Sequence, residues 1–585
     1  MNTPVGLGRS DDPAARPMSP DVYLTIAAFV LIVAALVCWK AATFIGGALG
    51  ASATVTAVIG VVLFVALAIV ATIVARSIAR ARARRRKPKG FADNSALTLW
   101  ASEKAARDRA QQTRPGMSAR DVAAAPLNGV GFHIAETLTG SAVVLSLEDH
   151  AGVCAPTGSG KTSGIMVAAA NSAPGPTIVT ATRAELLDLT AHERKRQWGS
   201  RPWVFDPLNI CSWPHTMFWN PVPACTDSER AESVALAFVF AGRKAGEQQT
   251  SGNAEFFNKE AAGILKVLLH AAALAGKNMS HVVFWAKDIS QRWDEPAEII
   301  TKSTHPQAER SWVDDLRNSS TGTSKSTADT QKTLQQLISP IATSTKLSWL
   351  TPGEGRTEFH PAAFVTSTDT LYIVCDSNRP QNVAPLCAML LQAVVDSGKQ
   401  AASATVSGRL DPPMRLAGDE LTNVAPLPSF PDLLSDARGW GMQIIAAWQS
   451  DAQLKQRWGD NGAAIINDNL TVEVILPGVR DTDTLSRVSK LVGEVSVVKA
   501  THTVNGSGAA ASVGAQTVEK VVLRADEIRR LGEHHPDQAL LVHRTMSAVM
   551  VRLPRWFDGP DAVQLRDDQV SVAQARRTFA QATNG

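Results

Sequence analysis

Several motifs that define common classes of enzyme and transporter are missing from this 585-residue sequence. The His-Glu-x-x-His motif, which supplies two zinc ligands and a general base to many metalloproteases, does not occur. A Leu-Ser-Gly-Gly-Gln-like signature, which an ABC transporter would need, is also absent. The six cysteines (residues 38, 154, 211, 225, 375 and 387) include no close pair at metal-ligand spacing. The sequence therefore argues against a tethered metalloprotease, an ABC transporter, a zinc site and a disulfide framework, and it favours reduced cytoplasmic thiols.

The sequence also lacks a strong overall charge. Its formal net charge is +4, so the net charge gives no argument for a nucleic-acid partner. With 45% hydrophobic and 19% charged residues, the composition is that of a folded protein. The length predicts two or three domains rather than one core.

The most informative stretch is Ala155-Pro-Thr-Gly-Ser-Gly-Lys-Thr162, which fits a phosphate-binding loop with Ala155 in place of the usual first glycine. Gly158 and Gly160 let successive backbone N–H groups point at phosphate oxygens, and Lys161 can reach the β- and γ-phosphates. The Thr162 hydroxyl can hold Mg²⁺, and a helix starting near Gly160 adds its positive dipole end. The alternative is a glycine turn in a core that binds no nucleotide. We expect a nucleotide site formed by Thr157, Gly158, Ser159, Gly160, Lys161 and Thr162.

The segments around this loop follow the order of an α/β fold. Residues 151–155, 177–181 and 202–206 are typical of buried strands, and residues 165–170 and 184–197 are typical of helices. This order predicts a parallel sheet. Further strands are expected at residues 370–375, 414–418, 442–447 and 470–476, and residues 538–543 and 548–553 are expected to form a closing hairpin.

An acidic pair, Asp419-Glu420, follows the strand expected at residues 414–418. In P-loop ATPases such a pair can order Mg²⁺ through water (Asp419) and activate the attacking water (Glu420). Arg415 and Ala417-Gly418 dilute a strand that is normally a run of large aliphatic residues. The alternative for the pair is an ordinary surface turn.

Gln449 lies at the end of the neighbouring predicted strand, where a polar side chain can contact the γ-phosphate or its attacking water. Its alternative role is to cap the next helix. The sequence thus predicts three catalytic residues, Lys161, Glu420 and Gln449, and two metal ligands, Thr162 and Asp419.

Two uncharged apolar runs, Val22–Trp39 and Val55–Ala75, predict a pair of transmembrane helices, because about 20 apolar residues cross a bilayer. A signal peptide is the alternative for the first run, but a basic region before it and a clean cleavage site are lacking. The stretch Arg76–Lys89 carries eight basic residues, which favours a cytoplasmic stop signal, with attraction to anionic lipid as a compatible second role and nucleic-acid binding as the less favoured alternative. Both termini are then cytoplasmic.

The predicted organisation has seven parts. They are a disordered tail (1–20), two transmembrane helices (21–75), a basic cytoplasmic stalk (76–127), the first part of the nucleotide-binding domain (128–225), an all-α insertion (226–355), the second part of the nucleotide-binding domain (356–557) and a tail (558–585). Two polar segments, Ser319–Thr333 and Thr501–Thr517, are expected to be loops, with a substrate contact as the alternative for the first. The tail is expected to carry a short amphipathic helix around Val570–Gln581.

The chain resembles the type IV coupling proteins of bacterial conjugation, in particular their actinobacterial branch. The resemblance covers most of residues 128–555 and rests on the two-span N-terminus, the loop Ala155–Thr162 and a series of motifs in the expected order. These motifs are Thr180–Asp188, Val204–Pro207, Asp419–Pro428, Ala447–Ser450, Leu476–Gly478 and Val542–Arg544. The string Asp-Glu…Asn-Val-Ala-Pro-Leu-Pro is the most specific of them.

The resemblance implies a RecA-like P-loop NTPase domain with an inserted all-α domain, using ATP and Mg²⁺. It implies a homo-hexamer at the inner (cytoplasmic) membrane, multi-pass, with its catalytic domain in the cytoplasm. Its expected partners are single-stranded DNA, a relaxase and type IV secretion channel components. Two alternatives remain: a double-stranded DNA translocase of the chromosome-segregation type and a non-hydrolysing substrate receptor. Arg183, Arg438 and Arg480 are candidates for an arginine finger acting on the neighbouring subunit.

Overall fold

The computed structural model describes residues 90–243, 252–376, 383–504 and 510–584, together with single positions between residues 40 and 62. The chain divides into two compact units, Met1–Lys87 and Pro88–Gly585. Among the described residues, no helix is long and apolar enough to cross a membrane. The two predicted spans lie outside the described residues apart from single positions, so the transmembrane hairpin stays a prediction.

One mixed sheet of eleven strands forms the centre of the second unit, in the order β2-β1-β15-β14-β11-β3-β10-β9-β4-β8-β5. From β11 to β5 the strands run parallel, while β14, β15, β1 and β2 extend the other side with antiparallel pairs. Because all seven parallel strands end at the same edge, the loops that follow them meet there. The strand bounds are β1 (Gly131–Thr137), β2 (Ala142–Ser146), β3 (Ala151–Cys154), β4 (Thr177–Ala181), β5 (Pro202–Phe205), β8 (Thr370–Val374), β9 (Met414–Gly418), β10 (Met442–Trp448), β11 (Val472–Ile475), β14 (Gln538–His543) and β15 (Val549–Arg552).

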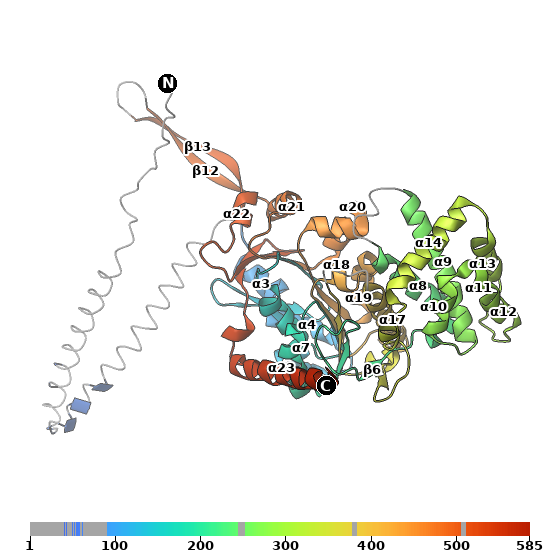
Figure 1. Ribbon diagram of the computed structural model, residues 1–585. Coiled ribbons are helices and arrows are strands. Elements are labelled where there is room, and N and C mark those ends of the chain that lie inside the picture. Colours follow the sequence, from blue (N-terminus) through green and yellow to red (C-terminus); the bar gives the residue numbers. More distant parts are fainter. Residues whose placement is uncertain are drawn as a thin grey trace. The chain divides into compact units, whose positions relative to one another are not determined.

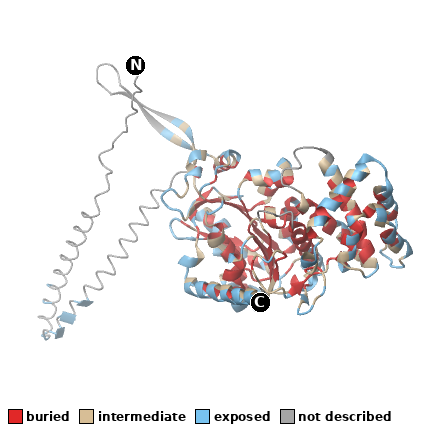
Figure 2. Ribbon diagram, viewed as in Figure 1, coloured by how far each residue is buried: buried red, intermediate tan, exposed pale blue. Residues whose placement is uncertain are grey.

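Helices cover the sheet, and Figure 2 shows the strands as a buried layer between them. Every residue of β3, β4, β8, β9, β10 and β11 is buried, as expected for parallel strands covered on both faces. The covering helices are α6 (Val167–Asn171), α7 (Glu185–Trp198), α17 (Ala384–Ser403), α18 (Leu421–Val424), α19 (Phe430–Trp440), α20 (Asp451–Asn469), α21 (Thr482–Val492), α22 (Ala525–Arg529) and α23 (Ala562–Asn584).

Arg415, which dilutes the sequence of β9, is a structural residue of the core. It is 1% exposed, and its Nε donates a hydrogen bond to Gln443 Oε1 at 2.7 Å. Its Nη1 donates to Ala169 O and Ser172 Oγ, both at 2.8 Å. Burial, helped by the charge of Arg194, lowers the pKa of Arg415 to about 9. The side chain ties β9 to β10 and α6, so the arginine supports the strand instead of interrupting it.

Residues 226–355 contain the predicted run of helices. They are α8 (Ser228–Gly242), α9 (Gly252–Leu274), α10 (Met279–Lys287), α11 (Ile289–Arg292), α12 (Asp294–Lys302), α13 (Trp312–Thr321), α14 (Lys325–Ile338) and α15 (Ser344–Leu347). Figure 1 shows them gathered on one side of the sheet. Helix α8 packs against α17, and one cluster of buried apolar side chains continues from the sheet into the insertion. The insertion therefore shares its core with the sheet. Short elements at its ends are β6 (Met217–Phe218), β7 (Thr357–Glu358) and α16 (Pro361–Phe364).

The loop predicted at Ser319–Thr333 is wrong, because this segment lies almost entirely in α13 and α14. Ser324 caps α14 by accepting a hydrogen bond from the Thr327 backbone N–H. Thr330, Leu334 and Ile338 are buried along one face of the helix. Their spacing of four residues is a helical signal that the serine and threonine content concealed.

The loop predicted at Thr501–Thr517 is also wrong. Strands β12 (Glu494–Val504) and β13 (Ala510–Val521) form an antiparallel ribbon in register from Glu494↔Val521 to Thr503↔Ser512. Residues 505–509 lie outside the described part of the chain. Valine recurs in both strands, and this β-branched residue favours extended backbone over the loop that the glycine and alanine content suggested.

The C-terminal half of the predicted stalk is built into the folded unit. Helices α3 (Asn94–Trp100), α4 (Glu103–Thr113) and α5 (Ala119–Ala124) precede β1, and α4 packs on β2. Alanines at 105, 106 and 110 are buried on one face of α4, which lets this helix approach the sheet closely.

The helix predicted at Val570–Gln581 is longer than expected. In the structure α23 covers Ala562–Asn584 and packs on α7. Arg576 donates two hydrogen bonds to the buried carboxylate of Asp188, at 2.7 and 2.6 Å, and Arg196 donates to Asp568. These pairs explain why the polar tail docks on the domain instead of ending as a short surface helix.

Candidate active site at the phosphate loop

The phosphate loop leaves the sheet from β3, which lies between β10 and β11. Gly152 is required in β3 because an added Cβ would lie 2.4 Å from the Trp448 ring and 2.5 Å from Leu470. At the end of the strand, Cys154 O accepts a hydrogen bond from Leu476 N at 2.9 Å. Both neighbouring strands therefore carry their own end loops to the two flanks of the phosphate loop.

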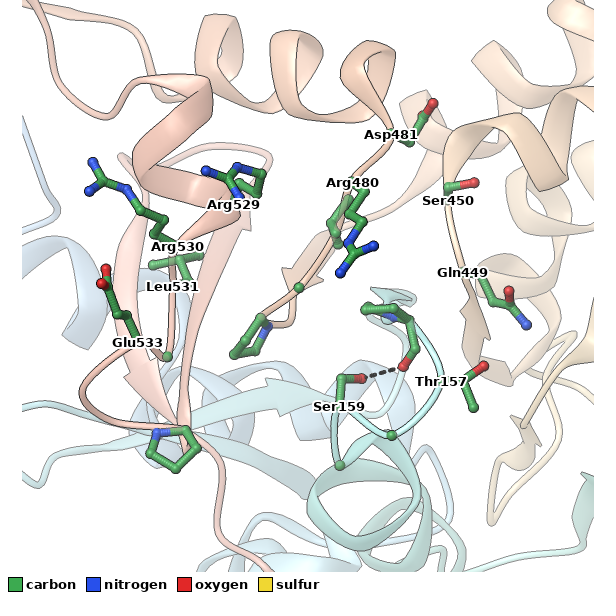
Figure 3. A pocket seen from close by; sticks show the side chains of 18 of the residues that line it. Thr157, Ser159, Gln449, Ser450, Arg480, Asp481, Arg529, Arg530, Leu531 and Glu533 are labelled. Carbon is green, nitrogen blue, oxygen red and sulfur yellow. Dashed lines mark hydrogen bonds between the residues drawn. The ribbon is translucent and has the colours of Figure 1, made fainter.

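The loop has the backbone that the sequence predicts. Gly158 and Gly160 adopt φ angles of 80° and 88°, which side-chain-bearing residues rarely reach. Ser159 Oγ donates a hydrogen bond to Pro156 O at 2.7 Å, which closes the turn (Figure 3). A short π-helix, Thr162–Met166, follows and leads into α6, so the loop ends at a helix N-terminus. Such an N-terminus stabilises an anion through its free N–H groups and its dipole.

The structure brings Lys161 and Thr162 together with the predicted acidic pair, more than 250 residues away in the sequence. Lys161 Nζ lies 3.2 Å from Asp419 Oδ1 and 3.1 Å from Glu420 Oε1. Thr162 Oγ1 donates a hydrogen bond to Asp419 Oδ2 at 3.3 Å. The contact exists because β9 carries Asp419 to the same edge of the sheet as β3.

Burial raises the pKa of the Asp419 carboxyl above its ordinary value, and the nearby charge of Lys161 opposes that rise. Asp419 is 8% exposed, so its charge depends on the few partners around it. Its backbone oxygen accepts a hydrogen bond from Thr180 Oγ1 at 2.9 Å. Thr180, in β4, therefore holds the backbone of the acidic pair in place.

Glu420 has a left-handed backbone, with φ 55° and ψ 40°. For a residue other than glycine this conformation costs on the order of 1–2 kcal/mol, and such strain is concentrated at functional sites. The strained turn starts α18 and places the Glu420 carboxylate beside Lys161. This position suits a group that acts on a molecule in the adjoining cavity.

Two cavities adjoin the phosphate loop. The first, of about 620 Å³, is lined by Lys161, Thr162, Asp419, Glu420 and Gln449, with Asp376, Asn423 and Arg183 also on its wall. The second, of about 1040 Å³, lies beyond Thr157–Gly160 and is lined by arginines at 480, 529, 530 and 555. Figure 3 shows Arg480 directed toward the loop residues Thr157 and Ser159. Because Thr157, Gly158 and Gly160 line both cavities, a triphosphate lying along the loop would extend from one into the other.

Gln449 follows the last residue of β10, and its side chain lines both cavities. Its backbone N–H donates to Gln453 Oε1 at 2.8 Å. The N-cap of α20 is Ser450, and no described side chain caps this helix, so Gln449 is not its capping residue. The exposed Gln449 side chain is available to a ligand at the loop.

The three arginines singled out from the sequence lie in different places. Arg183 lines the cavity beside Glu420, and Arg480 lines the larger cavity. Arg438 forms an ion pair of 3.1 Å with Asp149, which precedes β3 and so lies at the opposite edge of the sheet.

Three further polar residues at the site, Thr180, Asp376 and Asn423, were not predicted as site residues. Asp376 follows the end of β8, and Thr180 lies near the end of β4. A polar residue at the carboxyl end of a parallel strand is a signal for a site residue. Thr180 and Asp376 both carry this signal. Asn423 lies within α18 and belongs to the motif Asp419–Pro428, which carries the family resemblance but assigns this residue no role.

The residues present fit a nucleoside triphosphate with Mg²⁺. The two glycines turn the backbone as an N–H cradle for phosphate requires, and Lys161 lies beside it. Thr162 Oγ1 and Asp419 Oδ2, 3.3 Å apart, are hard oxygen donors of the kind that Mg²⁺ prefers.

A family model described as Type IV secretory system Conjugative DNA transfer matches residues 100–579. The Conjugal transfer protein TraG of Escherichia coli is 24% identical over 415 residues, which cover 66% of this chain and 62% of TraG. This chain therefore spans less than two thirds of the length of that relative.

Two solved structures have a similar fold. The bacterial conjugative coupling protein TrwBdeltaN70, in its unbound monoclinic form, matches with a TM-score of 0.52 and 17% identity over 70% of this chain and 85% of that one. The plasmid coupling protein TrwB in complex with the non-hydrolysable GTP analogue GDPNP matches with a TM-score of 0.51 and 17% identity, over 70% and 86%. At this identity the likeness shows the fold, that of a RecA-like P-loop NTPase. Since the family match covers most of the sequence and the fold agrees with it, this chain belongs to the type IV secretory system conjugative DNA transfer family, the coupling proteins of conjugation.

Proposed function

We propose that this chain is a membrane-anchored ATPase that couples ATP hydrolysis to the delivery of single-stranded DNA, with its bound relaxase, into a conjugative secretion channel. The observation that carries the proposal is the convergence of Lys161, Thr162, Asp419 and Glu420 in one cavity beside the phosphate loop. Membership of the conjugative transfer family and the similarity to TraG support the DNA and the channel as partners.

Each residue has a distinct role in this proposal. The N–H groups of the loop and Lys161 would bind the β- and γ-phosphates, and Thr162 and Asp419 would hold Mg²⁺. The metal supplies positive charge to the phosphate oxygens. Glu420 accepts a proton from the attacking water, and Gln449 contacts the γ-phosphate or that water. A bound phosphate would compete with Glu420 for Lys161, and loss of the Lys161–Glu420 ion pair would leave the Glu420 carboxylate free to accept that proton.

The membrane anchor is the pair of apolar runs at Val22–Trp39 and Val55–Ala75, followed by the basic stretch Arg76–Lys89. The proposed location is the inner membrane, with the nucleotide site in the cytoplasm. We further propose a homo-hexameric ring, in which an arginine of the next subunit completes the site; Arg183 and Arg480 reach the cavities of their own chain.

A cavity in the helical insertion is the proposed docking place for the cargo protein. Helices α8, α9 and α13 enclose about 510 Å³, lined by the apolar residues Leu236, Ile264 and Leu316. Gly263 lies inside α9 and lines this cavity, and no described atom lies within 4 Å of an added Cβ. A glycine inside a helix costs about 0.5–1 kcal/mol relative to alanine, so its presence at an unobstructed point suits close approach by a ligand. Glu260, Asp315 and Lys259 on the wall form no ion pair among the described residues, and Lys266 pairs with Glu232 at 3.6 Å, so the wall carries charges of both signs and favours a partner with apolar and mixed polar side chains.

The test is conjugative transfer by the full chain, with ATP turnover measured on the same purified proteins. Lys161→Ala should abolish both while membrane insertion stays intact, and the exposed Lys195→Ala serves as control. Glu420→Gln should bind ATP without turning it over. Normal transfer by Lys161→Ala would refute the motor, and normal transfer by an inactive Glu420→Gln would favour a substrate receptor. Turnover stimulated by double-stranded but not single-stranded DNA would favour the segregation-type translocase.

A further inference from the structure

Strands β10 and β11 flank β3, and each of them ends in a loop. A polar network whose members are mostly buried joins the two loops. Gln449 and Ser450 follow β10 and lead into Asp451, the first residue of α20, and the stretch Leu476–Asp481 follows β11. These loops place Gln449 and Arg480 in the same cavity wall as the phosphate loop (Figure 3). Whatever ties the two loops together sets the positions of Gln449 and Arg480 relative to a phosphate bound between them.

The first tie is the hydroxyl of Thr484, in the first turn of α21. Its Oγ1 accepts a hydrogen bond from Asp451 N at 3.0 Å and donates one to Asp481 Oδ2 at 2.6 Å. Asp451 is two residues from Gln449, and Asp481 is next to Arg480. Thr484 is fully buried, so water does not compete for these bonds.

The second tie is the guanidinium of Arg487, one helical turn further along α21. It bonds both oxygens of Asp451, with Nε–Oδ2 at 2.6 Å and Nη2–Oδ1 at 3.0 Å. It also bonds both oxygens of Glu473 in β11, with Nη1–Oε2 at 2.8 Å and Nη2–Oε1 at 2.6 Å. Burial alone would lower the pKa of Arg487, but the bonds to Glu473 and Asp451 outweigh burial and raise it. Paired, planar contacts of this kind fix geometry as well as charge.

We propose that Thr484 and Arg487 are positioning residues of the nucleotide site, which hold Gln449 and Arg480 against a triphosphate bound in the same chain. Neither residue is among those that line the two cavities beside the loop, so both act through Asp451, Asp481 and Glu473. Arg480 then has a role in its own subunit, as a residue beside the bound nucleotide. The inference rests on the proposed ATPase function.

The decisive pair of variants changes one hydroxyl. Thr484→Val keeps the shape of the side chain and removes both bonds, whereas Thr484→Ser keeps the hydroxyl. Thr482→Val, an exposed threonine in the same helical turn, controls for the loss of a threonine. We expect Thr484→Val to lower kcat for ATP at least tenfold with KM changed less than threefold, and Thr484→Ser and Thr482→Val to match the parent chain.

A double-mutant comparison separates positioning from general stability. If Thr484 acts through Gln449, Gln449→Ala and Thr484→Val together should be no slower than the slower single variant. A kcat for Thr484→Val equal to the parent, or losses that multiply in the double variant, would overturn the proposal. Arg487→Lys, which keeps the charge but cannot bridge two carboxylates in the same way, is the second variant if Thr484→Val fails to fold; an unchanged kcat would again overturn it. Full turnover by Lys161→Ala would instead refute the ATPase itself.

Discussion

Lys161 is the only described cation that the structure places within 4 Å of both Asp419 and Glu420. Replacing Lys161 should therefore reveal how much free energy it costs to bury the two carboxylates without a counterion. The side chains of Lys161, Asp419 and Glu420 are 10%, 11% and 14% exposed. At an effective dielectric constant of about 20, a contact of about 3.2 Å corresponds to roughly 5 kcal/mol of attraction, part of which offsets desolvation. Removing one partner from a buried pair costs about 3–5 kcal/mol. We expect Lys161→Met, which keeps an apolar stem, to lower the free energy of unfolding by about 3 kcal/mol at pH 7.

The loss should depend on pH with a defined sign. Burial raises the pKa of Asp419 above its ordinary value, Lys161 opposes the rise, and Lys161→Met removes that opposition. The penalty is therefore present while Asp419 is ionised, and it shrinks as pH falls through the raised pKa toward the ordinary value, where the carboxyl is neutral. Adding Asp419→Asn to Lys161→Met should restore at least half of the lost stability at pH 7.

The assay is urea unfolding of the full chain in detergent without nucleotide, followed by tryptophan fluorescence at pH 7 and pH 5. Lys195→Ala is the control for the loss of an exposed lysine. An unchanged midpoint for Lys161→Met at pH 7 would refute the reasoning. A double variant less stable than Lys161→Met would do the same, because it would show that the carboxylate needs no counterion.

Two further predictions concern other parts of the chain. Burial, reinforced by nearby arginines, lowers the pKa of His150 to about 3 and that of His543 to about 4, so both are neutral in the folded state. The stability that the two neutral histidines contribute is present above their unfolded pKa of about 6.5 and is lost as pH falls toward the folded pKa values, at up to about 1.4 kcal/mol per histidine per pH unit. His150→Asn should therefore make the urea midpoint fall less steeply between pH 6 and pH 4. An unchanged slope would contradict this. In the insertion, Gly263→Leu should keep or raise the thermal stability, since Leu is a better helix former than Gly, while conjugative transfer falls at least tenfold and ATP turnover is unchanged. Gly263→Ala, which adds a smaller side chain, is the control. Full transfer by Gly263→Leu would exclude this cavity as a docking place.

The predictions that succeeded depended on local signals. The strands at residues 177–181 and 414–418 were placed to the residue, because short apolar runs between turn residues are typical of buried strands. The two wrong loops show the limit of composition. Most serines and threonines in Ser319–Thr333 lie outside the buried faces of α13 and α14, although Ser320 and Thr330 are buried, and the described small residues of Thr501–Thr517 lie in a β-ribbon. Composition counts residues without regard to which face they occupy, so it cannot detect either case.

The roles of individual polar residues were harder to predict from the sequence. Arg415 weakened the prediction of a buried strand, yet its guanidinium donates to three acceptors, on β10, on α6 and on Ser172 directly after α6. These acceptors come from segments distant in sequence, and their convergence depends on strand order. The same holds for Arg487, whose two carboxylate partners lie on α20 and β11.

The sequence alone determined the phosphate loop and its backbone. Two glycines, a lysine and a threonine at fixed spacing meet the backbone and charge requirements of a phosphate loop, and all of these requirements fall within a few consecutive residues. It also indicated the acidic pair, since an Asp-Glu after a strand is a local pattern. Only the tertiary structure decided that Lys161 contacts that pair, that Thr180 holds its backbone, and that Thr484 links the loops on both flanks. Those contacts are set by which strands are neighbours and at what register. That arrangement is fixed by burial of the whole sheet, which no short stretch of sequence contains.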